Sequence, residues 1–350
     1  MEDFNQNDEL HTVELHLQVL NEYLNGEFNE LCINEPGTLW TYTHGHWNEI
    51  PMPVLDYTWC EELSRLVANY SSQAPEPIMS AELPGGERIE INLPPVTAGP
   101  SITIRLPRKG EAFTLEEIIE FGTFKKSEWI QTRGVSKEDR QELRNEVPTR
   151  DIELLELFAA KNVMGFFSKA VLYKKNIFFS GETGSGKTAL MNALSHKIPL
   201  DERIITVEDT RESRLPHRNQ VNLIFTRNAK ADEKLRVKGV LASTLRQFPS
   251  RVLLAEIRGD EAYFFFQNVV NSGHPGTMAS FHANSAKMAF RRMANMIQAS
   301  PEGGQLSQDL IIKDLYMLID IVVQCDRDEN GKPYVREIYF DPEYALKIAG

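Results

Sequence analysis

Residues 176–188 read NIFFSGETGSGKT, a short apolar run that breaks into three glycines, a lysine and a threonine. Residues 181–188 match the pattern GxxxxGK[ST] in full, between an expected strand and an expected helix. Glycines let successive backbone N–H groups turn toward one anion, and the lysine adds a positive charge. The stretch therefore predicts a phosphate-binding loop, with a glycine-rich turn that binds nothing as the alternative.

The loop geometry predicts which groups hold the phosphates. The loop backbone and the start of a helix over 188–198 bind the β-phosphate, Lys187 bridges the β- and γ-phosphates, and the Thr188 hydroxyl binds Mg²⁺. The predicted nucleotide-binding residues of the loop are Gly181, Glu182, Thr183, Gly184, Ser185, Gly186, Lys187 and Thr188.

Residues 151–350 show the pattern of a mostly parallel sheet. Short apolar runs alternate with helical segments, which is typical of an α/β fold with helices on both faces of its sheet. The segment DENGK at 328–332 predicts the turn of a closing hairpin. The expected strands contain NIFFS, RIITV, VNLIF, RVLLAEI, GTMASF and IDIVVQ.

Residues 1–135 are predicted to form a smaller α+β domain. Alternating stretches such as ERIEINLPP and SITIRLP indicate an antiparallel sheet, and CEELSRLVANYSS indicates a helix. Residues 136–150 are polar and rich in charge, so we place the linker between the two domains there.

Acidic residues end two of the expected strands. Glu256 ends RVLLAEI, where a P-loop fold needs an acid near Mg²⁺; its longer arm suits contact through a metal-bound water. RIITVEDTRE brings Glu208, Asp209 and Glu212 to the carboxyl edge of the sheet, where ligands of such sheets bind. The alternatives are a surface charge for Glu256 and a helix-capping role for Asp209.

Two histidines flank another expected strand. His274 and His282 belong to GHPGTMASFHA, and we expect both near the phosphate edge of the sheet. The alternative is that both are ordinary hydrogen-bonded histidines.

Charge and composition exclude several classes of protein. Residues 1–150 contain 12 Lys and Arg against 26 Asp and Glu, whereas residues 151–350 contain 26 against 24. An acidic amino-terminal half does not support direct binding of nucleic acid or anionic lipid. Three scattered cysteines support neither disulfides nor zinc, and the chain shows neither a signal peptide nor an apolar run of spanning length, which predicts a cytoplasmic protein.

The order and spacing of four motifs resemble the secretion ATPase superfamily. Within it, the chain is similar to the hexameric type IV secretion ATPases of conjugation and effector-export machines, over roughly 28–345. It lacks the CxxC…CxxC module of the pilus-retraction and type II secretion relatives. The motifs that correspond to Walker A, Asp box, Walker B and His box are GETGSGKT, VEDTRE, LLAEIRG and GHPGTMASFHANS.

The resemblance implies a RecA-like core, ATP and Mg²⁺ as cofactors, and a homo-hexameric ring with nucleotide between the two domains. It implies that Arg105 reaches the phosphates from the amino-terminal domain, with a surface cation as the alternative. It also implies that Glu212 positions the attacking water, with Glu208 in reserve, and that His282 and His274 sense the γ-phosphate.

The sequence thus predicts a Mg²⁺-dependent ATPase that drives pilus assembly and substrate transfer. Its expected partners are inner-membrane and cytoplasmic components of the secretion machine, including other secretion ATPases, which would hold it at the inner membrane. The alternatives are a nucleotide-gated docking platform with incidental turnover, a pilus or type II secretion ATPase, and a RecA-like nucleic-acid motor. The last is disfavoured because the chain shows no aromatic and basic groove for a single strand.

Overall fold

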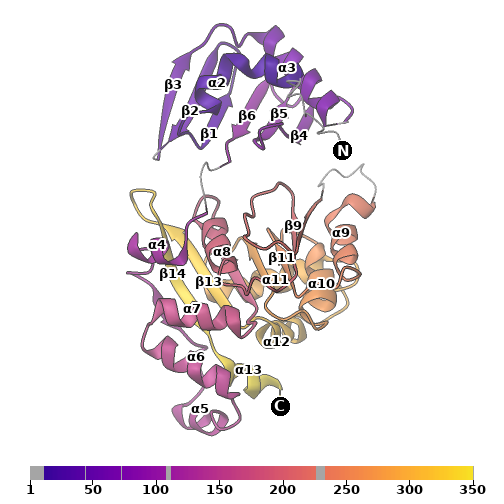
Figure 1. Cartoon of the computed structure of the whole chain (residues 1–350). Coiled ribbons are helices and arrows are strands. Elements are labelled where there is room, and N and C mark those ends of the chain that lie inside the picture. Colours follow the sequence, from indigo (N-terminus) through magenta and orange to yellow (C-terminus); the bar gives the residue numbers. More distant parts are fainter. Residues whose placement is uncertain (1–11, 44, 72, 108–111, 226–232, 350) are drawn as a thin grey trace, which may run out of the picture. The chain divides into compact units, whose positions relative to one another are not determined.

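The computed structural model describes residues 12–43, 45–71, 73–107, 112–225 and 233–349 (Figure 1). The chain divides into two compact units, Met1–Gly110 and Glu111–Gly350. The first unit ends earlier than the predicted boundary at residue 135, because strand β7 (Glu128–Ile130) pairs with a strand of the second unit. This pairing could not be predicted from the sequence, because β7 is short and follows a polar helix.

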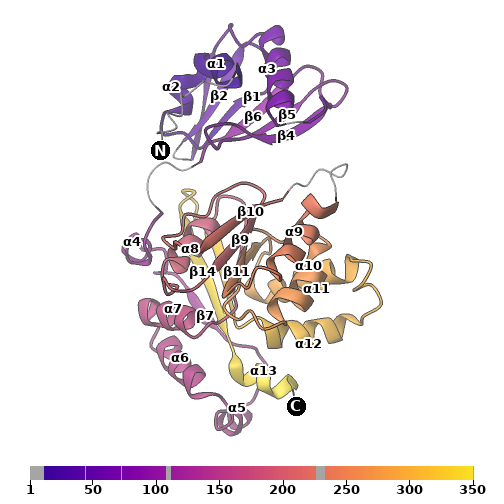
Figure 2. The same cartoon turned by 45° about the vertical axis from the view of Figure 1, so that its right-hand side comes forward.

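The first unit contains a six-stranded antiparallel sheet, as predicted (Figure 2). The strand order is β3-β2-β1-β6-β5-β4. Alternate residues of β5 and β6 point to the core, so Ile89, Ile91, Ile102 and Ile104 are buried. The strands are β1 Glu30–Ile33, β2 Thr38–Thr43, β3 His46–Pro51, β4 Ile78–Glu82, β5 Arg88–Asn92 and β6 Ser101–Arg105.

Helix α3 (Tyr57–Tyr70) packs its apolar side into the same core, which confirms the predicted helix. The helix begins there because the Asp56 side chain accepts a hydrogen bond from the Trp59 backbone N–H at 2.8 Å. Within the described residues, which begin at Thr12, three short helical segments precede the sheet: α1 Thr12–His16, η1 Leu17–Leu20 and α2 Asn21–Leu24.

The second unit contains an eight-stranded sheet in the order β10-β9-β11-β12-β8-β13-β14-β7. All neighbouring strands are parallel except the hairpin β13–β14, which confirms the predicted mostly parallel sheet and its closing hairpin. The strands are β8 Ile177–Ser180, β9 Ile204–Glu208, β10 Gln220–Ile224, β11 Arg251–Leu254, β12 Met278–Phe281, β13 Ile321–Arg327 and β14 Pro333–Phe340.

Helices cover both faces of this sheet (Figure 1). Neighbouring residues of one strand serve opposite layers: Phe179 packs with one apolar cluster and Phe178 with the other. One layer contains α4 Leu115–Glu120, α6 Thr149–Ala159, α7 Val163–Leu172 and α8 Lys187–Ser195; the other contains α9 Val237–Thr244, α10 Glu261–Phe265, the π-helical turn η3 Phe266–Val270, α11 Ala286–Ala299 and α12 Gln308–Leu318.

The segment predicted as a linker, 136–150, is ordered within the second unit. It contains α5 (Lys137–Leu143), whose Arg140 forms ion pairs at 2.7 Å with both Asp341 and Glu343. Glu343 belongs to the last helix, α13 (Pro342–Ala349). The segment is polar because it makes these charged contacts, and this polarity made it resemble a linker.

The described part of the chain contains no helix that is both long and apolar enough to cross a lipid bilayer. Cys32, Cys60 and Cys325 are unpaired and buried. Burial raises the pKa of Cys325 to about 12, which keeps its thiol protonated and unreactive at neutral pH.

Candidate active site around the glycine-rich loop

The glycine-rich loop joins the carboxyl end of β8 to the start of α8, as predicted. Gly181, Gly184 and Gly186 have φ values of +143°, +75° and +88°, which side chains disfavour. A Cβ atom on Gly181 would lie 2.2 Å from the Cys325 carbonyl oxygen, so this position also lacks space for one. The backbone conformation favours glycine at all three positions, and packing also requires it at Gly181.

Lys187 lies inside the curve of the loop. Its Nζ donates hydrogen bonds of 2.7 Å to the carbonyl oxygens of both Gly181 and Glu182. Burial lowers the pKa of Lys187, while the nearby carboxylates of Glu256 and Glu182 oppose that shift. The loop thus holds an ammonium group against its own carbonyls.

Thr188 follows on the first turn of α8 and is half-buried. Glu182, Thr183 and Gly184 are exposed at the tip of the loop, whereas Ser185 is buried and donates its hydroxyl to the Glu182 carbonyl at 2.8 Å. The hydroxyl of Ser185 therefore stabilises the loop from within.

Glu208, at the end of β9, organises the acidic segment that follows it. Its side chain is 1% exposed and accepts hydrogen bonds from the Glu212 N–H at 3.0 Å and from the N–H and hydroxyl of Ser213, both at 2.9 Å. Burial raises the pKa of Glu208, and these hydrogen bonds oppose the rise. The Glu208 side chain thus bonds to residues of its own loop.

Glu212 is tied to the helix that carries Thr188. Asn192 of α8 donates its side-chain amide to the Glu212 carbonyl at 3.2 Å. Because Asn192 is four residues after Thr188, both lie on the same side of α8. The structure therefore brings the Glu212 backbone to the side of α8 on which Thr188 lies.

Glu256 follows β11 and lies between Arg258 and His282. Arg258 contacts its Oε2 at 2.5 Å, and His282 Nε2 lies 2.9 Å from its Oε1. Burial acts to raise the pKa of Glu256, but Arg258, His282 and Lys187 outweigh burial and hold the pKa below its ordinary value. The carboxylate is therefore charged at neutral pH.

His282 connects Glu256 to the loop. Its Nδ1 donates to the Gly181 carbonyl at 2.8 Å, the same carbonyl that accepts from Lys187. The side chain is 42% exposed, so one face of the imidazole remains accessible. Gly181, Lys187, Glu256 and His282 thus lie in one connected group of contacts.

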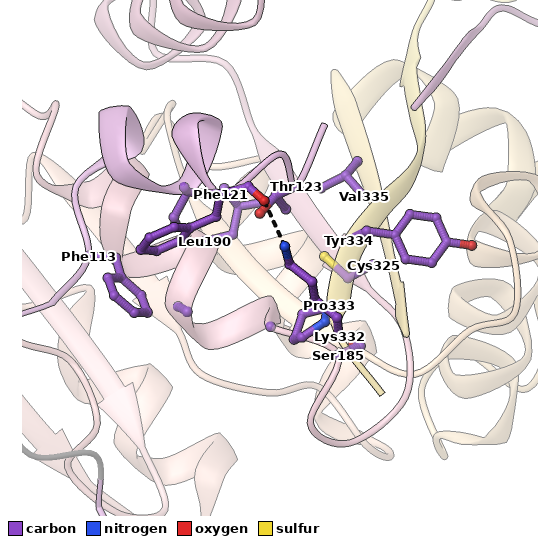
Figure 3. Close-up of a pocket in the computed structure, with 13 residues that line it drawn as sticks. Phe113, Phe121, Thr123, Ser185, Leu190, Cys325, Lys332, Pro333, Tyr334 and Val335 are labelled. Atoms are coloured by element: carbon purple, nitrogen blue, oxygen red, sulfur yellow. Dashed lines mark hydrogen bonds between the residues drawn. The ribbon is translucent and has the colours of Figure 1, made fainter. Parts of the chain in front are cut away.

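An apolar pocket of about 230 Å³ lies beside the loop, on the side that faces the hairpin β13–β14 (Figure 3). Ser185, Gly186 and Ala189 form one wall, and the hairpin β13–β14 forms another. Phe113 and Phe121 meet edge to face with ring centroids 5.0 Å apart. The remaining lining residues are Ile118, Thr123, Leu190, Cys325, Lys332, Pro333, Tyr334 and Val335.

Comparison with known proteins identifies the family. Residues 146–329 match the family described as "Type II/IV secretion system protein". The chain is 39% identical over 326 residues to the "Type IV secretion system protein VirB11" of Bartonella henselae, which covers 92% of this chain and 90% of that relative. This chain belongs to the type II/IV secretion system protein family. The predicted resemblance to the type IV secretion ATPases is confirmed.

Two solved structures have a similar fold. The VirB11 ATPase of the Brucella suis type IV secretion system, in complex with sulphate, aligns with a TM-score of 0.51 and 35% identity, over 96% of this chain and 99% of that one. The pilus retraction motor PilT with bound ADP aligns with a TM-score of 0.57 at 13% identity, over 95% and 84% of the two chains. The second likeness shows the fold alone, and the predicted RecA-like secretion ATPase fold is confirmed.

His274 does not lie where we predicted. It precedes β12, and the following residues, Gly276 and Thr277, donate their N–H groups to Asn176, just before β8. Since β12 and β8 are parallel, this is the amino edge of the sheet, whereas the glycine-rich loop and His282 lie at the carboxyl edge. A full strand separates the two histidines, so their closeness in sequence is misleading.

Arg105 lies on the first unit, at the end of β6. Its guanidinium contacts Glu30 on the neighbouring strand at 2.6 Å, and its side chain is 44% exposed. Both the phosphate role and the alternative, a surface cation, are compatible with this pairing.

Three site residues escaped the sequence reasoning. Arg258 pairs with Glu256, Asn192 holds Glu212, and Gln324 contacts the loop that follows His282. Two of them carried a signal: Arg258 is a cation two residues after a strand-ending acid, and Gln324 interrupts the apolar run IVVQC. Asn192 lies in an ordinary helix and carried none.

Proposed function

We propose that this chain is the ATP-hydrolysing motor of a bacterial type IV secretion system. The observation that carries the proposal is the joint contact of Lys187 and His282 with one loop carbonyl, that of Gly181, with Glu256 beside them. A loop that only binds phosphate needs the lysine alone. The added carboxylate and imidazole provide groups that respond to the terminal phosphate, which a motor requires.

Each group has a role in hydrolysis. Lys187 binds the β- and γ-phosphate oxygens, and the loop N–H groups hold the β-phosphate. Glu212 orients a water molecule and accepts its proton as the water oxygen bonds to the γ-phosphorus and the bond to the β–γ bridging oxygen breaks. ADP and inorganic phosphate leave, and His282 loses its phosphate contact.

The residues present fit a Mg²⁺ ion. Glu256 Oε1 is buried and accepts no hydrogen bond from a described residue, although His282 lies at ion-pair distance from it. A charged oxygen without a donor suits a metal-bound water, and Thr188 offers a hydroxyl on the same edge. Mg²⁺ binds through one or two protein oxygens plus nucleotide phosphates, and when bound it neutralises phosphate charge.

We place the nucleoside of ATP in the apolar pocket beside Gly186 and Ala189 (Figure 3). Lys187 and Glu256 lie at the γ-phosphate end of the site. We therefore expect the base at the opposite end, toward β13 and β14. The paired rings of Phe113 and Phe121 offer apolar surface for a planar base.

The assembly proposal follows from the family. We propose a homo-hexamer in which Arg105 reaches nucleotide phosphates from the first unit, at the cytoplasmic face of the inner membrane. Its partners are the inner-membrane and cytoplasmic components of the machine, including other secretion ATPases. The docking-platform and nucleic-acid alternatives keep the same P-loop but require no dependence of turnover on ring assembly.

Mass and turnover, measured together, test the proposal. We expect the particle mass to reach six protomers with ATP and Mg²⁺, and ATP turnover per protomer to rise with protein concentration. Lys187→Ala provides the blank for contaminating ATPase. A monomer at all concentrations, or turnover equal to the blank, would contradict a ring motor; salt-sensitive binding of single-stranded DNA would favour the nucleic-acid alternative instead.

A further inference from the structure

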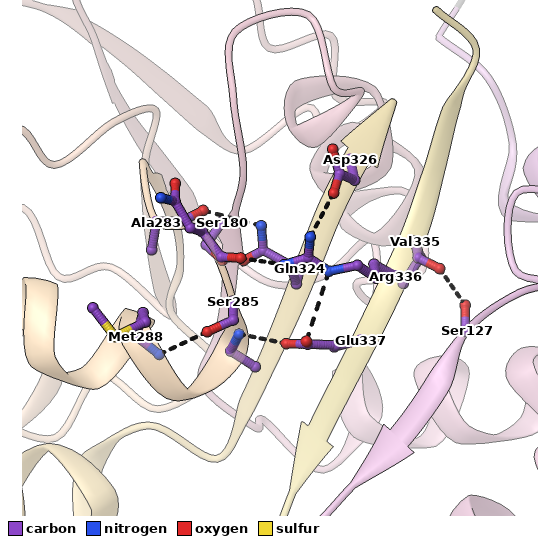
Figure 4. A network of polar contacts seen from close by, with 12 residues as sticks. Ser127, Ser180, Ala283, Ser285, Met288, Gln324, Asp326, Val335, Arg336 and Glu337 are labelled. Atoms are coloured by element: carbon purple, nitrogen blue, oxygen red, sulfur yellow. Dashed lines mark hydrogen bonds and ion pairs between the residues drawn. The ribbon is translucent and has the colours of Figure 1, made fainter. Parts of the chain in front are cut away.

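A ring made of three hydrogen bonds and the covalent chain lies next to the glycine-rich loop, and Figure 4 shows its two bonds to Gln324. Ser180, which precedes Gly181, donates its hydroxyl to Gln324 Oε1. Gln324 Nε2 donates to the Ala283 carbonyl at 3.0 Å. Ala283 follows His282, whose Nδ1 returns to the Gly181 carbonyl at 2.8 Å. The ring therefore joins the phosphate loop and the histidine through one glutamine.

The sheet register fixes Gln324 in this place. Within the sheet, Ser180 of β8 is aligned with Gln324 of β13 on one side and with Phe281 of β12 on the other. The three side chains therefore share one face of the sheet. Gln324 is 2% exposed and lies on a face otherwise lined by Phe178, Val322 and Phe281.

A buried amide in an apolar layer is costly unless both of its ends are bonded. Gln324 satisfies both, accepting from a hydroxyl and donating to a carbonyl. An apolar side chain would leave the Ala283 carbonyl without this donor, and a glutamate cannot donate to it at all. The chemistry of the position thus demands an amide, which core packing alone does not explain.

Two further side chains hold the same segment from β14. The Arg336 guanidinium donates to the Asn284 carbonyl, and Glu337 accepts the Ala286 N–H at 2.6 Å. The Ser285 hydroxyl caps α11 by accepting from the Met288 N–H at 3.1 Å. Residues 283–286 are therefore held by the hairpin β13–β14 (Figure 4), and the exposed His282 immediately precedes them in the sequence.

We propose that Gln324 is a positioning residue for ATP hydrolysis. It holds His282 against the glycine-rich loop, so that the imidazole meets the γ-phosphate in one orientation and passes the loss of phosphate to β13 and α11. This inference rests on the proposed ATPase function. Gln324 acts on the loop and on His282 through its bonds to Ser180 and Ala283.

The test replaces the amide in two ways. Gln324→Glu keeps size but removes the donor, and Gln324→Met keeps approximate volume but removes both polar ends. We expect kcat to fall about tenfold to a hundredfold, as for a misplacement near 1 Å, while the Kd for ATP changes less than about threefold. Gln308→Glu, which alters an amide that bonds Asn295 on the helical surface, should match the wild type.

A double-mutant cycle separates positioning from simple structural support. In a His282→Ala background, Gln324→Glu should lower kcat by less than about twofold, because the imidazole that Gln324 positions is already absent. An equal fold-loss in both backgrounds, or an unchanged kcat in folded Gln324 variants, overturns the proposal. If His282→Ala has no measurable turnover, the split between kcat and Kd in the single variants decides.

The outcome also distinguishes this inference from the proposed function. A wild-type protein and a Gln308→Glu control that both fail to hydrolyse ATP would refute the ATPase proposal itself. Hydrolysis by both, with full kcat in the Gln324 variants, would refute only the positioning role. Should Gln324→Met fail to fold, Ser180→Ala tests the same ring from its other end with loss of a single hydroxyl, and a kcat equal to the wild type would overturn the proposal.

Discussion

The side chain of Glu208 accepts a hydrogen bond from the backbone N–H of Glu212 at 3.0 Å. The two acids that compete for the water-positioning role are therefore bound to each other, and they differ in position. Glu208 is buried and bonds Ser213 as well, whereas Glu212 is half-buried at the edge of the sheet. Glu208 orders the loop, and we assign the water-positioning role to Glu212.

Glu212→Gln should therefore abolish most turnover while leaving ATP bound. The amide keeps the shape of the side chain but cannot accept the proton of the attacking water, so we expect kcat to fall by about 10² to 10⁴. The protein should accumulate with ATP in its closed state. Single-turnover hydrolysis and the ATP Kd measure the two effects.

Glu208→Gln should have a different signature, since its amide replaces an acceptor of several N–H and O–H donors. We expect a lower melting temperature together with lower turnover. If Glu208→Gln is inactive at full stability while Glu212→Gln hydrolyses ATP normally, the water-positioning role belongs to Glu208.

Lys187→Ala should remove ATP turnover with little loss of stability. The lysine is buried but bonds only two carbonyls of its own loop, so the fold loses few contacts, whereas the nucleotide loses its charge partner. We expect kcat to fall by about 10² or more. Lys197→Ala, which removes a surface pair with Glu116 just beyond α8, is the matched control and should remain active.

Arg105→Ala tests whether the first unit contributes to the reaction. Exposed ion pairs such as that with Glu30 contribute about 0–1 kcal/mol, so the melting temperature should change little. If the guanidinium reaches phosphate, turnover should fall about tenfold or more. Arg65→Ala changes another exposed arginine of the same unit and should leave turnover intact; equal rates in both variants would leave Arg105 as a surface cation.

The parallel sheet and its glycine-rich loop could be predicted from the sequence, because local conformational preferences agree with the tertiary structure there. The glycines of 181–186 are required by positive φ, and the buried strands of the parallel sheet are nearly continuous in apolar residues. Both signals are local, so they could be recognised without knowing the fold.

Predictions from the sequence were wrong where residues far away in the sequence determine the position of a segment. His274 and His282 are close in sequence, but a parallel strand carries them to opposite edges of the sheet. The polar segment around Arg140 resembled a linker because its acidic partners, Asp341 and Glu343, come some 200 positions later. Gln324 could not be assigned, since its partners belong to two other strands and loops.

Glu256→Gln should slow turnover in a way that added Mg²⁺ partly restores. The variant loses the carboxylate that would hold a metal-bound water, so Mg²⁺ binds more weakly while the glycine-rich loop is unchanged. A Mg²⁺ titration of kcat should shift to higher concentration in Glu256→Gln and not in Glu212→Gln. Identical titrations in the two variants would remove Glu256 from the metal site.

The same carboxylate should also govern acid stability. Arg258 and His282 hold the pKa of folded Glu256 below its ordinary value of 4.5. Because the folded pKa is depressed, this stabilisation is present above pH 4.5 and is lost as the pH falls through the folded value. The melting temperature of the wild type should therefore decline more steeply below pH 4.5 than that of Glu256→Gln, which has no charge to lose. Glu233→Gln, at an exposed position of the short helical turn Glu233–Leu235, should follow the wild type. Parallel declines in all three proteins would mean that the contacts of Arg258 and His282 with Glu256 contribute nothing to folding.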